Sequence, residues 1–341
     1  MRQGASDLHL TAGCPPVLRI DGDLVFVEGW QALRPEDIRS FVEAALNEEQ
    51  LRRLAEERDL DLPLVVPGLA RFRANAYHQQ GCCALAIRVI PRAIPTIEEL
   101  RLPPVVSSLA LRARGLVLVT GPTGTGKSTT LAAMIGHINR HRRAHVVTIE
   151  DPIEYQHTHG RSIINQRELG VDVLSFAGGL RAALREDPDV IMVGEMRDLD
   201  TTITALTAAE TGHLVLASMH TRDAASTVDR IIDQFPPYQQ TQVRTMLAAT
   251  LEAVIAQQLL PRTGGRGRTV AVEVMVATAA VRNLIREGKT HMIPNAISTG
   301  GRYGMQTMDQ ALRDLYHGGE VTYEDAVSRA FNPDELSRLI A

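Results

Sequence analysis

The eight residues from Gly121 to Ser128 constrain this 341-residue chain more than any other segment. They read Gly-Pro-Thr-Gly-Thr-Gly-Lys-Ser and match the pattern G-x-x-x-x-G-K-[ST]. An apolar strand-like run precedes them and a helical pattern follows, which is the context that this motif requires. Glycines let backbone N–H groups wrap phosphates at a helix N-terminus, where the helix dipole already favours anions. The segment therefore predicts a nucleoside triphosphate site.

Two polar side chains of this loop have an expected role. Lys127 reaches the β and γ phosphates, and the Ser128 hydroxyl is the expected ligand of Mg²⁺. The residues expected to bind ATP here are Gly121, Pro122, Thr123, Gly124, Thr125, Gly126, Lys127, Ser128 and Thr129.

Length and composition indicate two globular domains. Dividing the length by ~150 residues gives about 2.3 domains, and the 44% apolar and 22% charged residues are ordinary for a packed core. We expect a small α+β domain over residues 1–92, a proline-punctuated linker over 93–110, and an ATPase domain with C-terminal helices over 111–341.

Hydrophobic periodicity predicts different elements in the two domains. In the first we expect a hairpin at 17–23, one amphipathic helix at 35–53 and strands at 70–77 and 84–90. In the second, short apolar strands at 116–119, 146–149, 190–193 and 214–219 alternate with helices. This βαβ pattern is typical of a parallel sheet covered on both faces. Residues 239–260 and 305–341 are expected to be helical.

Several classes of protein are disfavoured. Lysine and arginine number 36 against 40 acidic residues, a net charge of 36 − 40 = −4, so we expect no nucleic-acid partner. No apolar stretch reaches the ~18 residues of a membrane helix, and the N-terminus lacks the apolar core of an export signal. The three cysteines, Cys14, Cys82 and Cys83, include no C-x-x-C pair, so we expect no zinc and a reducing compartment.

Hydrolysis also needs a carboxylate beside the terminal phosphate. Glu150, Asp151 and Glu154 follow the strand at 146–149, and Glu195 follows the strand at 190–193. These are the carboxyl ends of strands, where open α/β sheets bind ligands. Acids at strand ends are also commonly solvated or cap helices, which is the alternative reading.

Four segments resemble one known family. GPTGTGKSTT, TIEDPIEY, ALREDPDVIMVGEMRD and TGHLVLASMHT are similar to the Walker A, Asp box, atypical Walker B and His box of the secretion ATPases of type II secretion and type IV pili. The resemblance implies an α/β fold in which a PAS-like N-terminal α+β domain is joined by a linker to a RecA-like P-loop ATPase domain. Residues 6–10 and 15–16 are similar to the opening of that PAS-like domain. The family has a further helix before this opening, and we expect it to be shortened or missing here.

Two features favour the retraction branch of this family. Its assembly branch carries a four-cysteine zinc insertion in the C-terminal domain, where this chain has no cysteine. The segment AVRNLIRE at 280–287 and residues 304–308 are similar to the retraction branch. The match implies a homohexamer that hydrolyses ATP to drive pilin depolymerisation and twitching motility. Such a motor is cytoplasmic, peripheral at the inner-membrane face, and works with an inner-membrane pilus platform protein.

The resemblance also implies roles for single residues. Arg73 and Arg88 would reach the nucleotide's phosphates, and a guanidinium suits forked contacts to phosphate oxygens. Glu195 would activate water, while the Asp-box acids help with Mg²⁺ and water, without an indication of which acid matters most. His213 and His220 would couple the nucleotide state to the subunit interface.

Other interpretations stay open. The chain could be an accessory retraction ATPase, an assembly or type II secretion ATPase, or a nucleotide-dependent structural ring whose hydrolysis is incidental. A nucleic-acid translocase fits less well with 4% aromatic residues and a net negative charge. The loop at 262–268 and the helix at 280–289 are candidates for partner contact.

Overall fold

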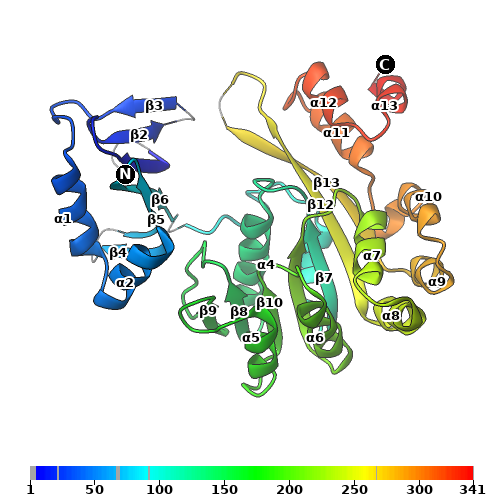
Figure 1. Ribbon diagram of the computed structural model, residues 1–341. Coiled ribbons are helices and arrows are strands. Elements are labelled where there is room, and N and C mark those ends of the chain that lie inside the picture. Colours follow the sequence, from blue (N-terminus) through cyan, green and yellow to red (C-terminus); the bar gives the residue numbers. More distant parts are fainter. Residues whose placement is uncertain (1–4, 21–22, 67–69, 91–92, 266, 341) are drawn as a thin grey trace. The chain divides into compact units, whose positions relative to one another are not determined.

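The computed structural model describes residues 5–20, 23–66, 70–90, 93–265 and 267–340. The chain divides into two compact units, Met1–Ala93 and Ile94–Ala341 (Figure 1). The stretch 93–110, for which we expect a linker, contains helix α3 (Val105–Ala110) and contributes Ile97, Leu102 and Val106 to the core of the second unit.

The first unit is a six-stranded antiparallel sheet with two helices packed on one face. The strand order is β3-β2-β1-β6-β5-β4. The core lies between the sheet and the helices and includes Ile38, Val42 and Leu54. The elements are β1 (Asp7–Leu10), β2 (Val17–Ile20), β3 (Asp23–Phe26), α1 (Pro35–Ala45), α2 (Glu48–Glu57), β4 (Asp59–Val66), β5 (Ala70–Gln79) and β6 (Cys82–Val89).

Two local predictions for this unit have different outcomes. The hairpin is confirmed by the antiparallel pairing of β2 with β3, although residues 21–22 of its turn lie outside the described residues. The single helix at 35–53 is wrong. The Asn47 side chain accepts a hydrogen bond from the Gln50 backbone at 2.9 Å, and the Gln50 side chain accepts one from the Asn47 backbone at 3.0 Å. This capping box starts a second helix, because an asparagine that bonds the backbone locally favours a helix end.

The second unit has a seven-stranded sheet in the order β13-β12-β7-β11-β10-β8-β9. All neighbours are parallel except β12 and β13, which form an antiparallel hairpin. The four strands expected in this domain are confirmed as β7, β8, β10 and β11. The strands are β7 (Gly115–Thr120), β8 (His145–Glu150), β9 (Ile163–Glu168), β10 (Val190–Val193), β11 (Leu214–Met219), β12 (Leu251–Pro261) and β13 (Arg268–Val276).

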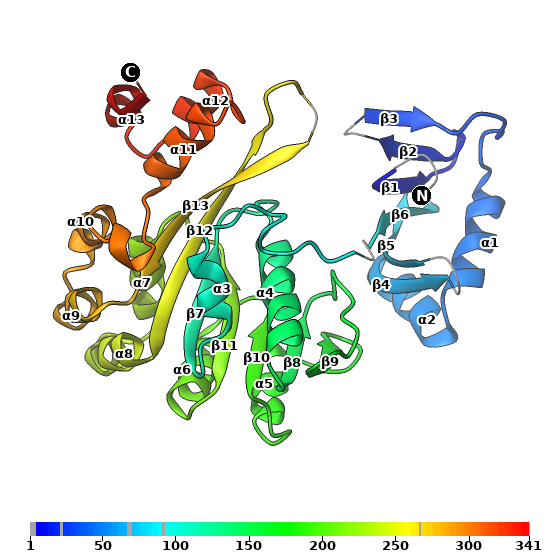
Figure 2. The same cartoon turned by 180° about the vertical axis from the view of Figure 1, so that it is seen from behind.

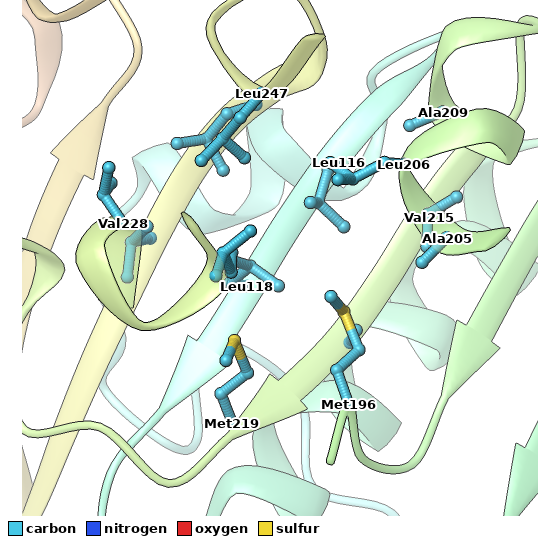
Figure 3. Packing of buried hydrophobic residues seen from close by; sticks show 14 of the residues in the cluster. Leu116, Leu118, Met196, Ala205, Leu206, Ala209, Val215, Met219, Val228 and Leu247 are labelled. Carbon is cyan, nitrogen blue, oxygen red and sulfur yellow. The ribbon is translucent and has the colours of Figure 1, made fainter. Parts of the chain in front are cut away.

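Helices cover both faces of this sheet (Figures 1 and 2). Leu116 and Leu118 of β7 point to the face covered by α5 to α8, while Val117 and Val119 point to the face covered by α3 and α4. Figure 3 shows Leu116 and Leu118 among the side chains that fill the first of these faces. The helices are α4 (Lys127–His141), α5 (Phe176–Ala183), α6 (Leu199–Glu210), α7 (Ala224–Asp233), α8 (Pro237–Thr250), α9 (Ala279–Glu287) and α10 (Ile293–Ser298).

The helix expected over 239–260 is half wrong. The chain is helical to Thr250, then enters β12, which pairs with β7 on one side and β13 on the other. An apolar run such as Leu251–Leu260 fits a buried strand or a buried helix equally well, so its tertiary partners decide.

The last part of the described chain, after α10, forms three short helices: α11 (Met308–His317), α12 (Tyr323–Arg329) and α13 (Pro333–Ile340). They confirm the helical prediction for the C-terminal residues. Met308 and Leu312 pack with Leu260 and Ala271, which lie where the β12–β13 hairpin runs past the sheet (Figure 1). Glu320 pairs with Arg101 and Arg262 and fixes this end of the hairpin.

Among the described residues, no helix combines the length and apolar character needed to cross a lipid bilayer.

Candidate active site

The loop between β7 and α4 has the backbone that its glycines make possible. Gly121, Gly124 and Gly126 have φ of +145°, +81° and +88°. A Cβ atom on Gly121 would lie 2.5 Å from the carbonyl oxygen of Gln257, so only glycine fits there. The loop ends at the N-terminus of α4, where free backbone N–H groups favour an anion.

Lys127 is the first residue of α4 and is almost fully buried. Its ammonium group donates hydrogen bonds to the carbonyl oxygens of Gly121 at 2.8 Å and Pro122 at 3.0 Å. Burial lowers the pKa of Lys127 below its ordinary value, and the carboxylates of Glu195 and Glu154 act in the opposite direction. Both acids therefore lie within electrostatic reach of the lysine that the sequence assigns to the phosphates.

The polar residues after Lys127 tie the loop to its surroundings. The Thr129 hydroxyl lies 2.9 Å from the hydroxyl of Tyr155, and the Thr130 hydroxyl accepts a 2.9 Å hydrogen bond from the Gln257 amide. Ser128 is half-buried at the second position of the helix. Its hydroxyl is a hard oxygen donor, the kind of ligand that Mg²⁺ prefers.

Glu195 follows β10 at the same edge of the sheet. One carboxylate oxygen lies 2.8 Å from the Arg197 Nε and the other lies 3.1 Å from the His220 Nε2. Burial raises the pKa of Glu195, but the hydrogen bonds and charges of Arg197 and His220 outweigh it and lower the pKa below its ordinary value. Glu195 is therefore ionised at neutral pH.

The two histidines of the His box are separated by the whole length of β11. His220 follows the strand and contacts Glu195, whereas His213 precedes it and its Nδ1 lies 2.9 Å from the Ala208 carbonyl oxygen. At about 3.3 Å per residue the two are roughly 23 Å apart along the strand. The structure thus brings His220 to the phosphate loop and places His213 at the opposite edge of the sheet.

The Asp-box acids have different surroundings. Glu150 is buried and accepts hydrogen bonds from the Thr148 hydroxyl at 2.6 Å and the Gln166 amide at 3.0 Å. Burial raises its pKa. Asp151 and Glu154 are exposed to solvent. The charge of Glu154 acts on Lys127 and that of Asp151 on Arg197, so each exposed acid lies within electrostatic reach of one cation of the site.

Arg73 and Arg88 lie in the first unit, opposite each other on strands β5 and β6. Arg88 donates to Asp7 at 2.7 Å, and Arg73 lies 3.5 Å from Asp61. Burial raises the pKa of Asp7, but hydrogen bonds from Arg88 and Ser6 outweigh it and lower the pKa. The two guanidinium groups thus share the sheet face opposite the helices, and both retain exposed surface.

Four residues of the site have no role predicted from the sequence, although Tyr155 and Arg197 lie in the Asp-box and Walker B segments. Arg197 lies two positions after Glu195, so the short spacing was an available signal. Tyr155, in the loop before β9, contacts Thr129 of the Walker A segment. Gln166, in β9, contacts Glu150 of the Asp box. Gln257 reaches the loop from β12, a segment expected to be helical, and no local pattern marks it.

The chain is similar in sequence to known proteins over most of its length. The model of the family "Type II/IV secretion system protein" matches residues 52–326. The type IV pilus retraction ATPase PilT of Pseudomonas aeruginosa is 47% identical over 335 residues, covering 98% of this chain and 97% of the relative. The chain belongs to the type II/IV secretion system protein family. Its membership in that family makes it an ATPase.

Two further similarities bear on the branch. The type IV pilus ATPase PilU of the same organism is 43% identical over 340 residues, covering 100% of this chain and 89% of the relative. A crystal structure of the pilus retraction motor PilT with bound ADP has a TM-score of 0.93 at 50% identity, covering 99% of this chain and 96% of that one. This chain therefore has the same fold as a pilus retraction motor that was crystallised with ADP.

Proposed function

We propose that this chain is the subunit of a homohexameric motor that hydrolyses ATP to drive type IV pilus retraction and twitching motility. It works in the cytoplasm at the inner-membrane face, bound to an inner-membrane pilus platform protein. The observation that carries the catalytic part is the pairing of Glu195 with Arg197 and His220 at the sheet edge that holds the phosphate loop. The near full-length similarity to PilT supports the direction of force.

The phosphate loop binds ATP through its backbone N–H groups and the N-terminus of α4. Lys127 exchanges its contacts with the loop carbonyls for the β and γ phosphates. Ser128 would hold Mg²⁺, which would supply neutralisation of the phosphate charge. Glycine at 121 and the bond from Gln257 to Thr130 fix the loop in this shape before the nucleotide arrives.

Glu195 orients the attacking water and accepts its proton. Arg197 and His220 hold the carboxylate ionised and fix both of its oxygens. Because the pKa of Glu195 is lowered, it is a weak base, so we assign it mainly the orientation of water in the transition state.

Among the Asp-box acids we propose Glu154 as the one closest to the chemistry. It is exposed and its charge reaches Lys127. Asp151, near Arg197, supports the site from the other side. Glu150 is buried against Thr148 and Gln166, so it positions the box and does not meet the nucleotide.

Three residues act between subunits in this proposal. Arg73 and Arg88 engage the phosphates when the N-terminal unit closes on a nucleotide, and hydrolysis releases that closure. His213, at the far edge of the sheet, transmits the nucleotide state to a neighbouring subunit, while His220 reports it beside Glu195.

Replacement of Glu195 tests the catalytic core of the proposal. In E195Q we expect ATP turnover to fall by at least about 100-fold, because the neutral amide neither orients the attacking water as a carboxylate does nor accepts its proton. Nucleotide binding and the hexameric molar mass should be retained. E210Q removes an exposed carboxylate at the end of α6 and is the matched control. Normal turnover in E195Q would overturn the assignment.

Complementation tests the direction of force. Cells that lack this gene should keep surface pili and lose twitching. Expression of the wild-type chain in these cells should restore twitching. Loss of surface pili on deletion would instead identify an assembly motor. Full rescue of twitching by E195Q would identify a structural ring.

A further inference from the structure

Glu273 is a buried carboxyl group in β13 that lies at the N-termini of two helices. It is 4% exposed. Its Oε1 accepts a 2.8 Å hydrogen bond from the backbone N–H of Ala224, the first residue of α7. The backbone N–H of Met308, the first residue of α11, also favours the ionised form of this carboxyl group, and the neighbouring Gln306 pairs with Val274, the residue after Glu273. One side chain therefore caps the start of α7 and lies beside the start of α11.

The position of Glu273 in the sheet links it to the active site. Glu273 is in register with Ala256, Ala256 with Thr120, and Thr120 with Met219. Thr120 precedes the phosphate loop and Met219 precedes His220. Glu273 thus lies in register with the carboxyl ends of β7 and β11, which the phosphate loop and His220 follow directly.

The segment His220–Asp223, which we name the His220 loop, is held firmly to α7. The Thr221 hydroxyl lies 2.6 Å from the Thr227 hydroxyl, which donates to the Asp223 carbonyl oxygen at 2.6 Å. The Asp223 side chain caps α7 by accepting from the Ser226 backbone at 2.7 Å. A displacement of the N-terminus of α7 therefore moves the loop that places His220 against Glu195.

The other helix leads to the C-terminal helices. Thr307 caps α11 by accepting a 3.2 Å hydrogen bond from the Gln310 backbone. Gln306 pairs with Val274 of β13 through two backbone hydrogen bonds. Met308 and Leu312 then carry α11 into the core shared with α12, α13 and the end of the β12–β13 hairpin.

The charged groups that face Glu273 are both acidic. They are Asp223 at the start of α7 and Asp309 in the first turn of α11. Within the described parts of the chain no basic side chain forms an ion pair with Glu273. Burial raises its pKa to about 7, although the N–H groups of Ala224 and Met308 favour the ionised form.

We propose that Glu273 is a positioning residue that couples the C-terminal helices to the active site by holding the N-termini of α7 and α11 on one carboxyl group. Through it, a partner that moves α11 changes the placement of His220 beside Glu195. The functional consequence rests on the role proposed above for His220, but the mechanical coupling does not.

Hydrogen exchange of the full-length chain measures the coupling directly. T307A removes the cap of α11, and T322A removes a like threonine cap from α12, which does not contact Glu273. We expect T307A to speed exchange within 305–312 by about fivefold, the factor for a lost cap, and within 220–226 by at least about twofold. T322A should leave 220–226 unchanged.

The same measurement in the E273A background isolates Glu273. There, T307A should no longer affect residues 220–226, because the connecting group is gone. Equal acceleration with and without Glu273, or none in either background, would overturn the proposal. These outcomes do not depend on turnover, so an inactive enzyme and an absent coupling are distinguished.

E273Q keeps the volume of the side chain should E273A not fold. Exchange within 220–226, corrected for the intrinsic pH dependence of amide exchange, should change between pH 6 and pH 8 in the wild-type chain. E273Q should show a smaller change, because the side chain at 273 no longer titrates while the ionisable groups of the segment itself, His220 and Asp223, are the same in both chains. The same corrected profile in both chains would also overturn the proposal.

Discussion

At the scale of single residues, the phosphate loop depends on the space at each glycine. Gly121 has no room for a Cβ atom, which would meet the Gln257 carbonyl oxygen at 2.5 Å and the Thr125 hydroxyl at 2.7 Å. Gly124 also has a positive φ, but a Cβ atom there would meet nothing within 4 Å. A side chain at position 121 would therefore add a steric clash to the backbone strain, whereas a side chain at position 124 would add backbone strain alone.

We expect G121A to lower the free energy of unfolding by about 3 kcal/mol and G124A by about 1 kcal/mol, since strain at a positive φ costs ~1–3 kcal/mol before any clash. Urea unfolding without nucleotide measures both. Equal losses in the two variants would show that Gln257 and its strand move away at little cost.

Glu273 gives the chain a pH-dependent stability. Its folded pKa of about 7 lies above the ordinary value of 4.5, so the folded state keeps a proton that the unfolded state has released. This contribution is fully present below pH 4.5 and is lost as pH rises through 7. The total change is about 3 kcal/mol at ~1.4 kcal/mol per pKa unit.

The comparison with E273Q isolates this group. Between pH 4.5 and pH 7.5 the stability of the wild-type chain should fall relative to E273Q by about 3 kcal/mol. Urea unfolding of both chains across that range measures it. Parallel stability curves would mean that the folded carboxyl group titrates normally.

At the scale of elements, Arg282 joins helix α9 to the end of α8. Its guanidinium donates to the carbonyl oxygens of Ala248 at 2.7 Å and Ala249 at 2.9 Å, and to Glu252 at 2.7 Å. These bonds cap the carbonyl end of α8 and satisfy the half-buried Glu252. Arg282 belongs to the segment that the sequence offers as a partner surface, but here it binds within the chain.

R282A should therefore destabilise the chain by about 2 kcal/mol, since it removes the charged donor of two helix carbonyls and leaves Glu252 with only the weaker pairing to Arg112 at 3.5 Å. R286A, on the exposed side of the same helix, should change stability by less than about 0.5 kcal/mol. Thermal or urea unfolding measures both. A similar small effect in both variants would show that water replaces the guanidinium without cost.

At the scale of the whole molecule, the two units have separate cores. Ile38 belongs to the core of the first unit and Ile135 to the core of the second, and both are 0% exposed. Independent cores predict two unfolding transitions. I38A should lower the free energy of unfolding of the first unit only, and I135A that of the second unit only, each by about 3 kcal/mol. Calorimetry measures this; a single transition lowered by both variants would contradict it.

The sequence alone determined the phosphate loop and the strands around it. Gly121 to Ser128 is contiguous, so its chemistry is complete in one short segment. The strands at 116–119 and 190–193 are short apolar runs between helical patterns, and their periodicity is a local property. The family and its activity depend on these local signals.

Tertiary structure decided everything that depends on register and burial. The pairing of β10 with β11 brings His220 to Glu195, while the length of β11 separates His213 from them. The depth of Glu150 and the strand character of β12 follow from neighbours distant in sequence. Glu273 shows the same principle, because its partners in α7 and α11 lie far from it along the chain, one before it and one after it. Such contacts arise only when a sheet sets its strands side by side, and periodicity along a single chain does not encode them.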